Sequence, residues 1–201
     1  MASVVPKQTA ETRFLTVEEF VDAYTRQPVE VVDGKIVEMA PAEVAHMLMA
    51  HFLYDALAAW AREGGLGRAF IETPYVLDGS RRKNWVQGAR VPDVSFLAQD
   101  RLKAHLDQHG ASGPFWLAPD LAVEIVSVND RYVDVQRKVV DYLRYGVRLV
   151  WVINPEMRVI RVFSPDDPEG RTLHEADTLT GDPVLPGWSI PVASVLDSSA
   201  G

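Results

Sequence analysis

The sequence predicts one α/β domain in which helices flank a mixed β-sheet and β-hairpins are added to it. Its 201 residues, 47% of them hydrophobic, fit a single globular domain with its own core. A strand–helix–strand run over residues 121–153 contains a connection long enough to join two parallel strands. The Asp33-Gly34 pair between two β-branched runs is a strong signal for a hairpin.

The composition sets the limits of this domain and of its chemistry. We expect the domain to span residues 14–196, between a flexible N-terminal tail (1–13) and a short C-terminal tail (197–201). The absence of cysteine excludes disulfides, thiolate zinc sites and cysteine nucleophiles, and it fits a reducing, cytoplasmic location. No apolar run approaches the roughly 20 residues that span a bilayer, so no membrane partner is expected.

The N-terminal elements have clear start and stop signals. Residues 16–19, Thr-Val-Glu-Glu, have the spacing of a capping box, which predicts a short helix after them. The hairpin covers residues 29–39. Residues 42–63 are rich in Ala, Leu and Met at helical spacing, and Gly64-Gly65 predicts where that helix ends.

The central part of the chain alternates apolar runs with polar connections. We interpret residues 69–77, 91–97 and 121–127 as strands, because each is short, apolar and rich in β-branched or aromatic side chains. Residues 80–90 are read as a polar loop, and residues 99–108 as a short helix before the third strand.

The C-terminal part completes the sheet. Residues 132–145 predict a helix, and Gly146 stands where a helix-ending glycine belongs. The apolar run 148–153 predicts a strand that pairs with residues 158–164 as a hairpin. Short strands and turns follow, up to the segment 185–191.

Glu124 is the most informative single residue. It interrupts a strand, 121–127, whose two faces are otherwise apolar, and such a strand is typical of a sheet buried on both sides. A carboxylate there needs a compensating cation or hydrogen-bond donors. A structural partner, such as a buried arginine, and a functional site both satisfy this requirement. Asp93, at the start of the preceding strand, could form with Glu124 a carboxylate pair suited to Mg²⁺ or Mn²⁺.

Lys138 has two interpretations on the predicted helix. It lies at the edge of the packing stripe formed by Val135, Val139, Tyr142 and Leu143, from which its ammonium could reach the two carboxylates. Alternatively, it is an exposed lysine that pairs with an aspartate on its own helix, Asp134 or Asp141.

The segment LAVEIVSVNDRYVDVQRKVVDYLRYGVRLVWVINP, residues 121–155, resembles the signature of the Uma-type putative restriction endonucleases, a bacterial family within the PD-(D/E)XK nuclease superfamily. VEVVDGKIVEMAP near the N-terminus, the VPDVSFL strand and the LPGWSIPV ending resemble further family motifs. The resemblance covers roughly residues 14–196. It implies a restriction-endonuclease-like mixed sheet flanked by helices, with added β-hairpins.

The resemblance also implies roles for individual residues. Asp93 matches the Asp of the Pro-Asp motif and Glu124 the second acid, and with the backbone carbonyl of Ile125 they would bind Mg²⁺ or Mn²⁺. The usual lysine position, two residues after the acid, is occupied by Val126, and Lys138 matches the family's displaced lysine. Glu30 and His46 match recurrent family positions and are possible accessory residues.

The function implied is metal-dependent endonuclease cleavage of DNA phosphodiester bonds. The loop residues Arg81, Arg82, Lys83 and Arg90, with Trp85 among them, could grip a phosphate backbone or be simply solvated. The net charge of −8 argues against a protein that coats nucleic acid, but it permits local phosphate contacts through a metal. The alternative is a nuclease fold that binds without cleaving; a different metal-dependent hydrolase is a third possibility. A homodimer would supply two sites for two strands, by analogy only.

Overall fold

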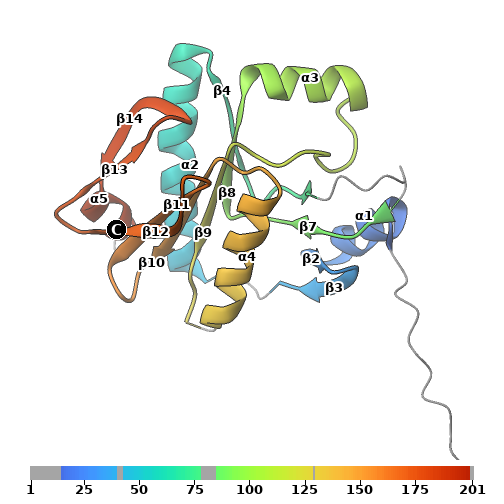
Figure 1. Ribbon diagram of the computed structural model, residues 1–201, viewed down its shortest axis with the longest axis horizontal. Helices are drawn as coiled ribbons and strands as arrows, with labels where there is room; N and C mark the ends of the chain where they lie inside the picture. The colour runs from blue at the N-terminus through green and yellow to red at the C-terminus, as the bar shows by residue number, and fades with distance from the viewer. Residues whose placement is uncertain (1–14, 40–42, 78–84, 129, 200–201) are drawn as a thin grey trace, which may run out of the picture.

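A six-stranded mixed sheet forms the centre of the computed structural model, which describes residues 15–39, 43–77, 85–128 and 130–199 (Figure 1). In spatial order its strands are β12 (Asp167–His174), β11 (Val159–Ser164), β10 (Leu149–Asn154), β9 (Leu121–Ile125), β8 (Val94–Ala98) and β4 (Gly67–Ile71). β9 and β10 are parallel, and every other neighbouring pair in this sheet is antiparallel. The predicted crossover is therefore confirmed: α4 (Tyr132–Arg144) joins the two parallel strands.

Two helices cover opposite faces of this sheet. α2 (Val44–Gly64) packs Leu53 and Leu57 on the face that carries Val123, in one core cluster. α4 packs Val139 and Tyr142 on the other face, in a second cluster. Because side chains alternate along β9, Glu124 points to the α4 side of the sheet.

A smaller sheet lies beside the α4 side (Figure 1). Its four strands are β3 (Lys35–Glu38), β2 (Val29–Val32), β7 (Ala89–Arg90) and β5 (Tyr75–Val76). α1 (Val17–Arg26) buries Phe20 against this sheet in a third cluster. The remaining elements are β1 (Leu15–Thr16), β6 (Trp85–Val86), α3 (Gln99–His109), β13 (Thr178–Gly181), β14 (Leu185–Pro191) and α5 (Val192–Leu196).

Several local predictions are confirmed. The Thr16 hydroxyl accepts a hydrogen bond from the Glu19 amide and the Glu19 carboxylate accepts one from the Thr16 amide, so the capping box is complete. Asp33 and Gly34 both have positive φ, as a tight β-hairpin turn requires.

None of the helices in the described part of the chain is long and apolar enough to cross a membrane.

Two other predictions are wrong. Residues 69–77 do not form one strand, because Glu72 has a φ of 43° and turns the chain from β4 in the large sheet into β5 in the small one. Residues 85–90, predicted as the second part of a loop, contain β6 and β7 instead, and Arg90 is buried there. The many polar and charged residues of this stretch led to the loop prediction, because β6 and β7 have only two residues each and pair through their backbones.

Candidate active site

Strand register brings Asp93 and Glu124 together. β8 and β9 are antiparallel with Val94 opposite Val123, so Asp93, which precedes β8, lies beside Glu124 near the end of β9. The amide of Ile125 donates a 2.6 Å hydrogen bond to Asp93 Oδ2. Both carboxylates are buried, 7% and 6% exposed, so each needs polar partners within the fold.

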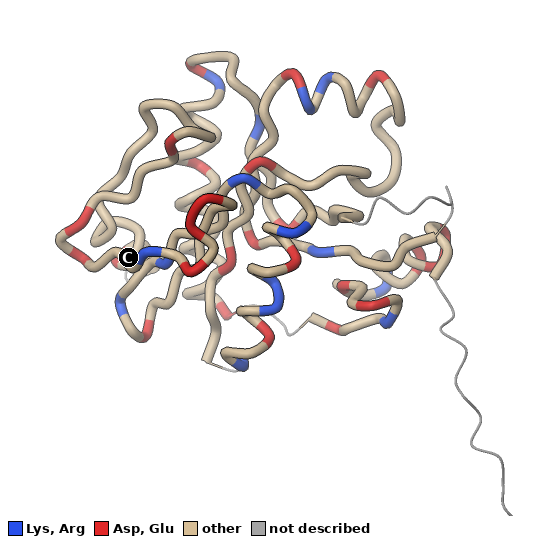
Figure 2. Tube along the Cα trace, in the orientation of Figure 1, with Lys and Arg blue, Asp and Glu red and all other residues tan. Residues whose placement is uncertain are grey.

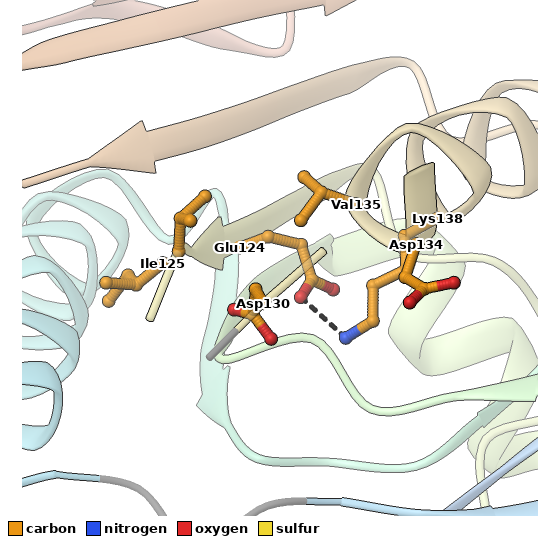
Figure 3. A pocket seen from close by; sticks show the side chains of 7 residues that line it. Glu124, Ile125, Asp130, Asp134, Val135 and Lys138 are labelled. Carbon is orange, nitrogen blue, oxygen red and sulfur yellow. Dashed lines mark hydrogen bonds and ion pairs between the residues drawn. The ribbon is translucent and has the colours of Figure 1, made fainter. Parts of the chain in front are cut away.

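Lys138 and Tyr142 supply those partners for Glu124. They lie one helical turn apart on α4, on the face toward the sheet. Lys138 Nζ lies 2.8 Å from Glu124 Oε2, and the Tyr142 hydroxyl donates to Glu124 Oε1 at 2.6 Å. Figure 3 shows the lysine reaching from the helix to Glu124. Lys138 therefore takes the inward position, and it has these contacts instead of an ion pair with Asp134 or Asp141.

Glu30 extends the cluster from the small sheet. It is 3% exposed on β2, and its Oε1 lies 3.2 Å from Lys138 Nζ and accepts a hydrogen bond from the amide of Val91. Arg90 Nη1 donates to Glu30 Oε2 at 2.8 Å, and its second terminal nitrogen pairs with Asp141 on α4. A continuous chain of charged contacts thus joins the small sheet to α4.

His46 approaches the acid pair from the first turn of α2. Its Nε2 lies 3.1 Å from Asp93 Oδ1. Its Nδ1 is buried and has no hydrogen-bond partner among the described residues. Burial lowers the pKa of His46, but the hydrogen bond and negative charge of Asp93 outweigh it, and the net pKa is raised.

Burial and neighbouring charges shift the pKa values of Glu124 and Lys138. Burial raises the pKa of Glu124 to about 7, and the charges of Asp93 and Glu30 add to this while Lys138 opposes it. Burial would lower the pKa of Lys138, yet the carboxylates of Glu124, Glu30 and Asp93 raise it, so the ammonium stays charged. The site therefore favours cations.

The donor set fits a divalent cation. Each carboxylate oxygen of Asp93 and Glu124 meets one nitrogen or hydroxyl partner, which leaves lone pairs free on all four oxygens. The cluster holds four acidic side chains (Asp93, Glu124, Glu30 and Asp141) and three basic ones (Arg90, Lys138 and His46), so its acidic groups outnumber its basic groups. No group of three His, Asp or Glu side chains within the described residues is arranged to bind a metal. Two carboxylates with water ligands suit Mg²⁺, which retains much of its hydration.

A small pocket opens between the end of β9 and the start of α4 (Figure 3). Polar and apolar side chains both line it: Glu124, Ile125, Val126, Asp130, Asp134, Val135 and Lys138. The carboxylate cluster is thus accessible from one side.

Comparisons with known proteins show the family and the fold of the chain. A family model described as "Putative restriction endonuclease" (Uma2) matches residues 17–193. The chain belongs to the Uma2 family. No curated protein matches the sequence. A crystal structure of a putative nuclease belonging to DUF820 from Anabaena variabilis ATCC 29413 is similar, with a TM-score of 0.78 and 19% sequence identity over 92% of this chain and 99% of that one. The likeness confirms the nuclease-like mixed sheet flanked by helices.

The basic residues that the Uma2 sequence offers for contacts with a phosphate backbone have different places in the structure. Arg81, Arg82 and Lys83 lie outside the described residues. Arg90 was expected in an exposed loop, and that placement is wrong: it is 4% exposed in β7. A contact of Arg90 with a nucleic-acid backbone would require breaking its ion pairs with Glu30 and Asp141.

Sequence reasoning missed two site residues of this Uma2 chain. Tyr142 was assigned to the packing stripe, and helical periodicity cannot show that its hydroxyl reaches Glu124. Asp141 was considered only as a partner of Lys138, whereas it pairs with Arg90. The second Pro-Asp pair, Pro119-Asp120, has a different environment: Asp120 is fully buried and accepts hydrogen bonds from the Ala98 amide and from two arginines.

Proposed function

We propose that this protein is an endonuclease that hydrolyses DNA phosphodiester bonds with Mg²⁺ or Mn²⁺. One observation carries the proposal. The chain belongs to the Uma2 family, and two buried carboxylates, one on β9 and one just before the adjacent β8, lie together with a lysine ammonium 2.8 Å from the first. Such a set combines metal-binding oxygens with a fixed positive charge next to an open pocket.

Asp93, Glu124 and the main-chain carbonyl of Ile125 would bind the ion. When bound, the ion would polarise the phosphate and lower the pKa of an attacking water. The hydrogen bonds from Ile125 and Tyr142 hold the two carboxylates in fixed orientations, and such outer contacts normally tune metal affinity.

Lys138 would stabilise the negative charge that develops on the phosphate oxygens, or orient the attacking water. Its ammonium is preorganised by two carboxylates and so pays little reorganisation cost during the reaction. Glu30 also contacts this ammonium, and His46 contacts Asp93. Glu30 and His46 would thus have accessory roles, in which Glu30 acts on Lys138 and His46 acts on Asp93.

The acidic balance of the chain limits how DNA would bind. Figure 2 shows acidic and basic residues interspersed along the trace, without a basic stripe in the part of the chain that the structure describes. Bulk electrostatic attraction is therefore weak, and the substrate would depend on contacts at the site itself. We accordingly expect modest affinity for DNA, with metal-bridged phosphate binding contributing a large share. A homodimer would allow cleavage of both strands.

Cleavage of supercoiled, linear and single-stranded DNA with Mg²⁺ or Mn²⁺ tests the proposal. We expect metal-dependent cleavage that Asp93→Asn and Lys138→Ala abolish. Asp107→Asn and Lys103→Ala, at exposed positions of α3, are matched controls that keep activity. Cleavage that survives in Asp93→Asn would contradict the assignment of the site. No cleavage by any form, with no metal binding in calorimetry, would favour a nuclease fold that binds without cleaving.

A further inference from the structure

Arg90 lies buried on β7, between the small sheet and α4. Its guanidinium is 5% exposed and is shared by two carboxylates, Glu30 on β2 and Asp141 on α4. Arginine presents a rigid fork of donors, so it can fix two carboxylates at once in a way that lysine cannot. The side chain therefore ties the small sheet to the helix that carries Lys138.

The first effect of this tie is geometric. Asp141 and Lys138 are three residues apart on α4, so they lie on neighbouring positions of one helix face. By holding Asp141, Arg90 restrains the rotation and position of that face. The ammonium of Lys138 is thereby directed at the carboxylate cluster.

The second effect is a competition between two carboxylates for one ammonium. Lys138 Nζ lies 2.8 Å from Glu124 and 3.2 Å from Glu30. Arg90 neutralises Glu30 through its 2.8 Å contact, which weakens the hold of Glu30 on the lysine. Without Arg90, a buried and uncompensated Glu30 would attract Lys138 more strongly and draw it from Glu124.

We propose that Arg90 is a positioning residue, which keeps Lys138 directed at Glu124 by neutralising Glu30 and holding Asp141. This inference rests on the proposed nuclease function, because Lys138 is the group through which Arg90 acts. It differs from the expectation that Arg90 contacts the DNA backbone, and the two roles predict different kinetics.

Steady-state cleavage of duplex DNA by Arg90→Gln separates the two roles. Loss of an outer-shell contact typically costs roughly 10- to 100-fold in activity, and we expect this loss in kcat with KM nearly unchanged. The double variant Glu30→Gln/Arg90→Gln removes the uncompensated carboxylate as well. We expect it to cleave faster than Arg90→Gln alone, because a neutral side chain at position 30 no longer competes with Glu124 for the Lys138 ammonium.

Arg101→Gln is the matched control for structural damage. Arg101 also pairs with a fully buried carboxylate, Asp120, but it lies on α3 and belongs to no contact of the cluster. We expect this variant to lose thermal stability while its kcat stays at the wild-type value. An equal loss of kcat in Arg101→Gln and Arg90→Gln would reduce Arg90 to a structural role.

Crystal structures of the wild type and of Arg90→Gln give a result that does not depend on activity. We expect Nζ of Lys138 to move from Glu124 toward Glu30 in the variant. An unmoved ammonium, or a raised KM with kcat retained and a strong salt dependence, would overturn the positioning role. A wild type that cleaves no DNA would instead refute the proposed function, and the two crystal structures would still decide whether Arg90 positions Lys138.

Discussion

Replacing Tyr142 by phenylalanine removes one hydroxyl from a fully buried ring. The ring remains in the α4-side core, while Glu124 loses the 2.6 Å hydrogen bond to its Oε1. Glu124 then keeps Lys138 as its remaining side-chain partner. We expect this variant to fold but to be less stable, and to bind Mg²⁺ or Mn²⁺ more weakly.

The size of the effect depends on the charge of Glu124. A hydrogen bond to an ionised group contributes about 1.5–3 kcal/mol to stability, and one between neutral groups about 0.5–1.5 kcal/mol. The pKa of Glu124 is raised from 4.5 to about 7, so the carboxylate is ionised at pH 8 and largely protonated at pH 5. The larger loss is therefore expected at pH 8.

The direction of the pH dependence follows from proton binding. Because the pKa of Glu124 is higher in the folded protein, the folded state binds this proton more tightly, and the contribution of Glu124 to wild-type stability falls as pH rises from about 4.5 to 7. Tyr142→Phe removes a donor that favours the ionised form. The variant should therefore lose stability more steeply than the wild type over this rise in pH.

Urea denaturation at pH 5 and pH 8 measures both effects. Tyr75→Phe is the matched control, because Tyr75 is also fully buried and its hydroxyl hydrogen-bonds a neutral group, Ser95 Oγ, at 2.8 Å. We expect the control to lose about 0.5–1.5 kcal/mol at both pH values. A loss in Tyr142→Phe that is no larger than the control's, or that is equal at pH 5 and pH 8, would refute the assignment of an ionised acceptor.

Three further predictions concern the stability of the fold. Asp120→Ala leaves the Ala98 amide without its buried acceptor and two partly exposed arginines without their ion pairs, so unfolding measurements should show a loss of about 1–3 kcal/mol; an unchanged stability would contradict this. Gly67→Ala would place a Cβ 2.2 Å from the carbonyl oxygen of Leu97 at a φ of 154°, so a thermal shift assay should show strong destabilisation, and an unchanged Tm would count against it. Burial, and next the charge of His109, lowers the pKa of His105, so the contribution of His105 to stability is present above pH 6.5 and is lost on acidification. His105→Leu should therefore lose less stability than the wild type between neutral and acidic pH. Equal losses in both proteins would show that His105 does not cause the acid destabilisation.

Local chemistry made much of the fold predictable. The capping box at Thr16, the turn at Asp33 and the crossover helix each depend on residues close in sequence. Glu124 was identified because a carboxylate on a strand buried on both faces must have a partner. Signals of this kind need no knowledge of distant contacts.

The errors came from contacts between residues far apart in the chain. Arg90 was assigned to a loop because its neighbours are polar, yet Glu30 and Asp141, 60 and 51 residues away, bury it. The break at Glu72 depends on a backbone angle that neither hydrophobicity nor strand propensity reports. The role of Tyr142 depends on one oxygen atom, which a periodicity argument treats as part of an apolar ring.

The placement of Lys138 on α4 instead of β9 has an evolutionary consequence. Where acid and lysine share one strand two residues apart, the sequence between them cannot change in length. Here the connection from Ile125 to Tyr132 separates them, while the helix–sheet contacts of Val139 and Tyr142 fix the lysine. Insertions in this connection should be tolerated, as they are in surface loops generally. Such insertions would change the entrance to the pocket, which Asp130 of this connection lines, while the charged groups on β9 and α4 stay in place.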